Sequence, residues 1–272
     1  KNNFFHIFLN MENPSILKQI GNTPLIKLIQ HSEMTGCNIY GKAEYFNPGG
    51  SVKDRAALYI VKNALKNQKL EKGGIIVEGT AGNTGIGLAV VCKEYGLKLK
   101  VVIPKTQSTE KKQLLKKMGA ELIEVDAVPY TNPNNYIKQS KVIAENLNKT
   151  NNHGVVWANQ FDNLENTKSH IETTAEEIWT QTGGEINGFT CAVGTGGTLA
   201  GVSMGLKKRN KNIKIALSDP MGSSLYSYVK TKKLQNSGSS ITEGIGTGRV
   251  TKNFEKALVD DAFQVDDVEA LN

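Results

Sequence analysis

Cysteine and histidine are scarce in this chain of 272 residues. The three cysteines, Cys37, Cys92 and Cys191, are far apart and odd in number, which argues against a disulfide framework and against a Cys-x-x-Cys metal site. The four histidines are equally isolated, and none has the spacing of a zinc-binding helix. We therefore expect no metal centre, and we expect a protein of the reducing cytoplasm.

Long apolar runs are also absent. No stretch approaches the length needed to cross a bilayer, and the apolar residues 4–9 are too few for the core of a signal sequence. The net charge is +7, but the lysines are scattered or lie on helical patterns such as residues 110–119. No nucleic-acid-binding signature accompanies them. We expect neither a membrane nor a nucleic acid as partner, although the basic surface can attract small anions.

Short β-rich runs alternate with helical patterns along most of the chain. This alternation predicts an α/β fold with largely parallel strands and two lobes, between which a ligand would bind. Strands are expected at 98–104, 120–125, 155–160 and 213–220, helices at 108–119, 134–148 and 163–180, and strand–loop–helix units with glycine-rich loops at 73–96 and 188–210.

Residues 47–65, NPGGSVKDRAALYIVKNAL, predict a helix with Lys53 in its first turn. Ser51 and Asp54 match a capping box at the helix start. The unpaired amides of a helix N-terminus favour anions, so this position favours the neutral amine of lysine, which is a nucleophile and can form a Schiff base. The apolar face expected for this helix consists of Ala57, Ile60, Val61, Ala64 and Leu65.

Two glycine-rich loops precede helices and suit anionic groups. Residues 192–201, AVGTGGTLAG, have the pattern of a phosphate cradle, in which backbone amides and a helix N-terminus face the ligand. Residues 78–87, EGTAGNTGIG, are a second such loop that suits a carboxylate. The G-x-G-x-x-G pattern fails in both loops, and no G-x-x-x-x-G-K-[ST] is present, so a monophosphate fits better than a dinucleotide or a nucleoside triphosphate. A nucleophilic lysine with both loops predicts an enzyme that holds pyridoxal phosphate and an α-amino acid.

In these motifs the sequence resembles the cysteine synthase and cystathionine β-synthase group of pyridoxal-phosphate enzymes, which have the tryptophan-synthase-β-like fold. The resemblance extends from IGNTPLIKL, residues 20–28, to DDAFQVDDVEAL near the end. It implies that Lys53 is the Schiff-base lysine and that Asn83 contacts the cofactor ring. By the same resemblance the phosphate is held by Gly194, Thr195, Gly196, Gly197 and Thr198, the other side of the cofactor is lined by Gly244 to Gly246, and the substrate carboxylate is bound by Thr80, Ala81, Gly82, Thr84 and Gln160.

The resemblance also implies a homodimer and a two-lobed fold. We place a larger, cofactor-phosphate-binding lobe at 11–46 and 158–272, and a smaller mobile lobe, which carries the substrate-carboxylate loop, at 47–157. Ala81 stands where most relatives carry serine, so one hydroxyl donor to the substrate is missing. The chain ends at Asn272, before the segment whose serine or threonine faces the pyridine nitrogen in relatives. We therefore expect a piece of a longer protein, with reduced activity by itself.

The activity that the resemblance implies is β-replacement, catalysed by a transferase of cysteine biosynthesis: O-acetylserine and sulfide give cysteine and acetate. Cystathionine β-synthase, which joins serine to homocysteine, is the alternative within the group, because NPGGSVKDR and SDPMGSS look at least as much like that branch. A non-catalytic relative that binds metabolites or partners in the same crevice stays open as a different class. A nucleotide-dependent oxidoreductase would require tight binding of NAD.

Overall fold

The computed structural model describes residues 15–80 and 82–271. It has the predicted α/β architecture, with strands and helices alternating from residue 75 onward. The α-helices are α2 (Ile29–Thr35), α3 (Lys53–Lys66), α4 (Asn83–Glu94), α5 (Thr109–Lys117), α6 (Tyr136–Asn148), α7 (Glu165–Ser169), α8 (Ala175–Gln181), α9 (Gly197–Arg209), α10 (Leu225–Thr231) and α11 (Asp267–Leu271). Short 3₁₀ turns are η1 (Ile16–Gln19), η2 (Glu44–Phe46) and η4 (Phe254–Lys256), and η3 (His170–Thr174) is a π-helical turn.

A four-stranded parallel sheet forms one half of the molecule. Its strand order is β5-β4-β3-β6, and the four strands are β3 (Ile75–Gly79), β4 (Lys98–Pro104), β5 (Glu121–Val125) and β6 (Val155–Trp157). Each connection between parallel neighbours contains a helix, as a parallel crossover requires. The predicted strands and helices of this region are confirmed, apart from shifts of a few residues at their ends.

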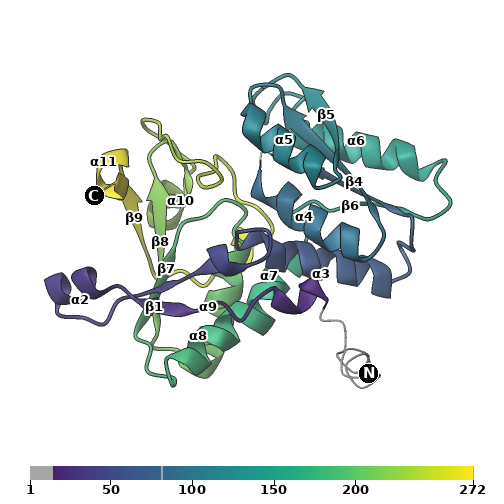
Figure 1. The fold of residues 1–272 in the computed structure, drawn as a ribbon. Helices are drawn as coiled ribbons and strands as arrows, with labels where there is room; N and C mark the ends of the chain where they lie inside the picture. Colours follow the sequence, from purple (N-terminus) through teal and green to yellow (C-terminus); the bar gives the residue numbers. More distant parts are fainter. Residues whose placement is uncertain (1–14, 81, 272) are drawn as a thin grey trace, which may run out of the picture.

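A three-stranded parallel sheet forms the other half. The order is β7-β8-β9, with β7 (Gly188–Cys191), β8 (Lys214–Pro220) and β9 (Asp261–Val265). The long helix predicted at 163–180 is present as α7, η3 and α8 in succession. Figure 1 shows the two sheets on opposite sides of the molecule, with α3 and α7 between them.

The N-terminal segment contains elements that the sequence pattern did not predict. Strands β1 (Leu25–Lys27) and β2 (Tyr40–Lys42) pair antiparallel in a separate two-stranded sheet, and α2 connects them. After η2, the chain enters α3, which packs against both α4 and α7. Figure 1 shows β1 and α2 on the side of the three-stranded half and α3 between the halves, and Lys53 is the first residue of α3.

Helix α3 has the apolar face that its spacing predicted. Ala57, Ile60, Val61 and Ala64 are buried in the core beneath the four-stranded sheet, and Leu65 packs against that core at its edge. Full burial of a side chain the size of Ile60 stabilises a fold by about 1.5–3 kcal/mol. The three-stranded half has its own core around α9 and β8. Hydrophobic packing thus fixes α3, and with it the position of Lys53.

Within residues 15–80 and 82–271, every helix is too short or too polar to cross a membrane. Those residues also contain no group of three or more His, Cys, Asp or Glu side chains that could hold a metal ion.

Candidate active site

A cavity of about 1010 Å³ opens between the start of α3 and the loop that precedes α9. Lys53 lines it from the first turn of α3. The predicted phosphate-binding residues Gly194, Thr195, Gly196 and Thr198 line it from the opposite side, together with Gly244. Residues more than a hundred positions apart in the sequence are therefore gathered around one space. The volume is large enough for a small organic molecule.

Lys53 begins α3, but the predicted capping box does not form. The hydroxyl of Ser51 accepts from the backbone N–H of Lys53 at 3.2 Å, one residue earlier than a capping box requires. The carboxylate of Asp54 accepts from the N–H of Gly49 instead of reaching back to Ser51. Asp54 is buried and bonds the amide of Gly49, so its side chain stabilises the loop before the helix.

The pKa of Lys53 lies below its ordinary value of 10.5, as its proposed chemistry requires. The main cause is burial, which penalises the charged ammonium, and the nearby Cys191 opposes this effect. The sequence argument attributed the effect to the helix N-terminus; the structure adds desolvation of the amine as a cause. A lysine with a lowered pKa is more often a neutral, nucleophilic amine.

The loop before α9 has the shape of an anion cradle. Gly196 has a left-handed backbone with φ of +88°, and α9 begins at Gly197, so the first amides of a 13-residue helix face the loop. A Cβ atom on Gly197 would lie 2.1 Å from Oδ1 of Asn166, so only glycine fits there. The residues present therefore fit a phosphate group, because the loop offers amide and hydroxyl donors and residues 194–198 include no acidic side chain; Glu44 and Glu185 line other parts of the cavity.

The predicted carboxylate loop lies at the end of β3 and the start of α4. The hydroxyl of Thr84 donates to Oε1 of Gln160 at 2.5 Å, and the N–H of Gly82 donates to the hydroxyl of Thr80 at 3.2 Å. Asn83 is the first residue of α4 and is exposed. Ala81 lies outside the described residues. None of the other four predicted residues of this loop, nor Gln160, is part of the lining of the large cavity.

Asn166 connects Gln160 to the phosphate loop, and the sequence argument missed it. Its Nδ2 donates both to the backbone carbonyl of Gln160 and to the hydroxyl of Thr195, each at 2.9 Å. The side chain is 1% exposed. A buried amide that bonds both sides fixes the spacing between the predicted carboxylate site and the phosphate cradle. No local pattern around Asn166 indicates this role.

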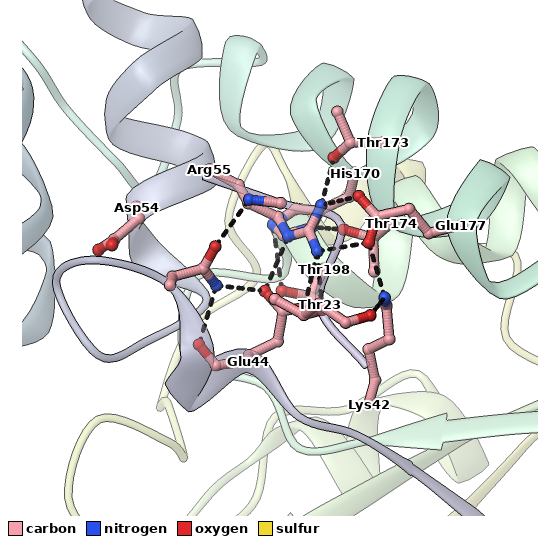
Figure 2. A network of polar contacts seen from close by, with 12 residues as sticks. Thr23, Lys42, Glu44, Asp54, Arg55, His170, Thr173, Thr174, Glu177 and Thr198 are labelled. Atoms are coloured by element: carbon pink, nitrogen blue, oxygen red, sulfur yellow. Dashed lines mark hydrogen bonds and ion pairs between the residues drawn. The ribbon is translucent and has the colours of Figure 1, made fainter. Parts of the chain in front are cut away.

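Arg55 was missed as well, although it lies two residues from Lys53. Its guanidinium is 1% exposed and makes bidentate contacts with Glu44, at 2.7 and 2.8 Å, and with Glu177, at 2.6 and 2.8 Å. Lys42 bonds Glu177 at 2.6 Å. Figure 2 shows this cluster beside the start of α3. Hydrogen bonds from Arg55 and Lys42 outweigh burial and lower the pKa of Glu177 to about 2.

Comparison with known proteins identifies the family. The family model for pyridoxal-phosphate dependent enzymes matches residues 16–272. The chain is 53% identical over 257 residues to cysteine synthase 1 of Neurospora crassa, covering 93% of this chain and 67% of that protein. It is 42% identical to a cysteine synthase of Dictyostelium discoideum, covering 94% and 69%. The chain belongs to the family of pyridoxal-phosphate dependent enzymes.

Solved structures support the same assignment. The crystal structure of a hydrogen sulfide-producing enzyme from Fusobacterium nucleatum matches with a TM-score of 0.80 and 35% identity, covering 95% of this chain and 81% of that one. An O-acetylserine dependent cystathionine β-synthase from Helicobacter pylori matches with a TM-score of 0.80 and 32% identity, covering 94% and 80%. The chain spans about two thirds of the length of the curated relatives.

Proposed function

We propose that this protein catalyses pyridoxal-phosphate-dependent β-replacement, in which O-acetylserine and sulfide give cysteine and acetate. One observation carries the proposal: Lys53, with a lowered pKa, lines the same cavity as the cradle residues Gly194, Thr195, Gly196 and Thr198. The relatives named cysteine synthase support this choice of reaction.

The residues take distinct parts in this proposal. Lys53 would hold the cofactor through Nζ, the backbone amides and hydroxyls of Gly194–Thr198 would hold its phosphate, and Gly244 would line its other side. Thr80, Ala81, Gly82, Thr84 and Gln160 would bind the substrate carboxylate, and Asn83 would contact the cofactor ring. When bound, pyridoxal phosphate supplies an electron sink that stabilises negative charge at the substrate α-carbon.

Lys53 also moves the proton in this scheme. Nζ of Lys53 would take the proton from the substrate α-carbon, and would return it after acetate has left the β-carbon and sulfide has bonded there. A neutral amine is required for the first step, and burial favours that form. Lys53 is thus both the anchor and the general base.

A spectrum and a product assay test the proposal. Pyridoxal phosphate added to the purified chain should give a new visible absorbance that Lys53→Ala abolishes. Lys62→Ala is the matched control, because Lys62 is an exposed lysine of the same helix. O-Acetylserine and sulfide should then yield cysteine with the unmodified chain and with Lys62→Ala. Cofactor binding that is unaffected by Lys53→Ala would refute the assignment of the lysine.

Cystathionine β-synthase activity is the second candidate, and two relatives favour it. A cystathionine β-synthase of Apis mellifera is 38% identical, and the Helicobacter pylori enzyme described above carries that name. Offering sulfide or homocysteine with either O-acetylserine or serine separates the two activities. Cystathionine as the sole product would replace the cysteine synthase assignment. Cofactor binding without turnover of any pair would favour a non-catalytic relative.

We also propose a homodimer, supported by exposed apolar side chains near the site. Tyr45 and Phe46 are 65% and 59% exposed, and their rings lie 4.8 Å apart on η2, just before the loop that leads to Lys53. Aromatic groups of this kind are common in interface cores. Tyr45→Ser with Phe46→Ser should produce a monomer in analytical ultracentrifugation. A parent chain that is itself monomeric would contradict the dimer.

Lobe limits and location remain proposals too. The separate hydrophobic cores support the boundary near residue 157, whereas Leu17 and Ile20 of the proposed larger lobe pack against the core of the four-stranded half. Limited proteolysis would test both boundaries; residues 11–14 of the proposed larger lobe lie outside the described part. We propose the cytoplasm as the location. One yeast relative is named a putative mitochondrial cysteine synthase, so imaging of the tagged protein should distinguish the two compartments.

A further inference from the structure

A buried histidine lies behind the phosphate cradle and bonds one of its hydroxyl groups. Nε2 of His170 is 3.2 Å from Oγ1 of Thr198, and Nδ1 is 2.8 Å from Oγ1 of Thr174. His170 is 1% and Thr174 is 2% exposed, whereas Thr198 lines the large cavity. Figure 2 shows the three side chains together, next to the Arg55 cluster.

His170 is neutral under ordinary conditions. Burial lowers its pKa to about 3, and the positive charges of Arg55 and Lys53 act in the same direction, against Glu44 and Glu177. A neutral imidazole carries one N–H and one lone pair, so its two ring nitrogens have opposite roles. One of its two neighbours must donate to the ring, and the other must accept from it.

The burial of Thr174 decides between the two arrangements. If Nδ1 carried the proton, Thr174 would accept, and its own hydroxyl hydrogen would need another acceptor. Among the described residues, His170 is the hydrogen-bond partner of the Thr174 side chain. A buried hydroxyl hydrogen without an acceptor is costly. The favoured arrangement therefore has Thr174 donating to Nδ1 and Nε2–H donating to Thr198.

We propose that His170 is a positioning residue that directs the hydroxyl hydrogen of Thr198 into the cavity, where it donates to an anionic phosphate group. This inference rests on the proposed function, since the phosphate is that of the proposed cofactor. In the opposite tautomer, the hydroxyl of Thr198 would donate its hydrogen bond to Nε2 and would present only oxygen lone pairs to the ligand. An anion is repelled by such lone pairs and attracted by the hydroxyl hydrogen.

The surrounding helices hold His170 rigidly in this place. It begins the π-helical turn η3, a local widening that recurs at functional sites. Helix α9 packs directly on this turn because Gly201 has no side chain: a Cβ there would lie 2.4 Å from Cβ of His170. Thr198 lies one turn earlier on α9, so the same close packing sets the distance between Thr198 and the imidazole.

Nitrogen NMR tests the tautomer directly. With ¹⁵N-labelled histidine, a two-bond proton–nitrogen correlation spectrum identifies which ring nitrogen of His170 is protonated, and the His170→Gln spectrum assigns its signals. We expect the proton on Nε2 with pyridoxal phosphate bound. A proton on Nδ1 in that complex would overturn the proposal.

Cofactor affinity provides a second test through a double-mutant cycle. His170→Phe should weaken pyridoxal phosphate binding about fivefold, the scale of one hydrogen bond. The same substitution in a Thr198→Val background should change the Kd less than twofold, because the hydroxyl that it orients is gone. His170→Gln keeps an amide donor in place of Nε2–H and should bind within twofold of the parent chain.

Two outcomes separate this inference from the proposed function. If the parent chain binds no pyridoxal phosphate, the proposed function fails together with the inference. If it binds the cofactor but His170→Phe weakens binding equally with and without the Thr198 hydroxyl, only the positioning role is refuted. Thermal unfolding of each apo variant shows whether His170→Phe still folds. If it does not fold, two other measurements decide: the cofactor affinity of His170→Gln, and the ring nitrogen of His170 that NMR finds protonated.

Discussion

The guanidinium of Arg55 and the carboxylate of Glu177 form a bidentate pair, with both N–O distances below 3 Å. Arg55 belongs to the helix that starts at Lys53, whereas Glu177 belongs to α8 in the three-stranded half. The pair therefore ties the start of the lysine helix to the helices behind the phosphate cradle. Glu44 holds the other edge of the same guanidinium.

We expect Glu177→Ala to destabilise the fold by about 3 kcal/mol, because Arg55 and Lys42 would then share Glu44 as their remaining carboxylate in the cluster, which leaves one buried positive charge in excess. Glu176→Ala is the matched control: Glu176 pairs with Arg209 at the surface, so its loss should cost less than about 1 kcal/mol. Urea unfolding followed by circular dichroism measures both variants. Equal losses of unfolding free energy in the two variants would show that the buried pair stabilises the fold no more than the surface pair does.

The cradle makes a second prediction at Gly197. A methyl group there would collide with Asn166, which bonds both Gln160 and Thr195. Overpacking of this kind costs about 1–3 kcal/mol and displaces backbone. We expect Gly197→Ala to weaken pyridoxal phosphate binding about tenfold or more, since about 1.4 kcal/mol lost from binding is a tenfold change.

Gly248→Ala is the control for this substitution, because a Cβ there meets nothing within 4 Å. Its Kd for the cofactor should equal that of the parent chain. Fluorescence titration of both variants provides the comparison. Unchanged affinity in Gly197→Ala would mean that the loop adapts, and that the cradle does not depend on the close approach to Asn166.

Local signals predicted a large part of this fold. The strand–loop–helix units at β3–α4 and β7–α9 were evident because each combines a strand run, a glycine loop and a helical period within about 25 residues. Lys53 was correctly placed in the first turn of its helix. These features depend on neighbours in the sequence, so the sequence alone can specify them.

The features that the sequence did not predict depend on distant partners. Strands β1 and β2 have three residues each and exist through pairing with one another. Arg55 bonds Glu177, 122 positions away, and His170 bonds Thr198, 28 positions away. The capping box at Ser51 was wrong for a similar reason, since a loop amide competes for Asp54. Periodicity carries no information on such contacts.

The pair formed by Thr84 and Gln160 predicts a separable effect on substrate binding. Both side chains are buried, and the threonine hydroxyl donates to the glutamine amide oxygen at 2.5 Å. Removing the donor leaves that oxygen unpaired, which costs about 1–3 kcal/mol. We expect Thr84→Val to raise the KM for O-acetylserine about tenfold by disordering Gln160, with a smaller change in the Kd for pyridoxal phosphate.

Thr84→Ser supplies the matched control, because it keeps the hydroxyl and removes only a methyl group. Its KM should stay within about threefold of the parent value. Steady-state kinetics with varied O-acetylserine, together with cofactor titration, measure both quantities. A loss of cofactor affinity in Thr84→Val as large as the rise in KM would place this residue at the cofactor and not at the substrate.

Glu78, next to the carboxylate loop, should make the stability of the protein depend on pH. It is 1% exposed on β3, and its Oε2 has no hydrogen-bond partner among the described residues. Burial raises its pKa from 4.5 to about 8, against smaller opposing effects from hydrogen bonds with Gln160 and Asn159. The folded state thus keeps a proton that the unfolded chain releases. The stability from this proton is complete below pH 4.5 and is lost as the pH rises toward 8.

The isosteric variant Glu78→Gln cannot ionise and should escape this loss. Its free energy of unfolding, relative to that of the parent chain, should rise between about pH 5 and pH 8, by at most about 1.4 kcal/mol per pH unit, and then level off. Asp54, whose pKa burial raises to about 6, is present in both proteins and cancels in the difference. Urea titrations across this range measure the curve. Parallel stability curves for the two proteins would mean that Glu78 is already ionised in the folded state. Its negative charge would then repel a substrate carboxylate at the neighbouring loop.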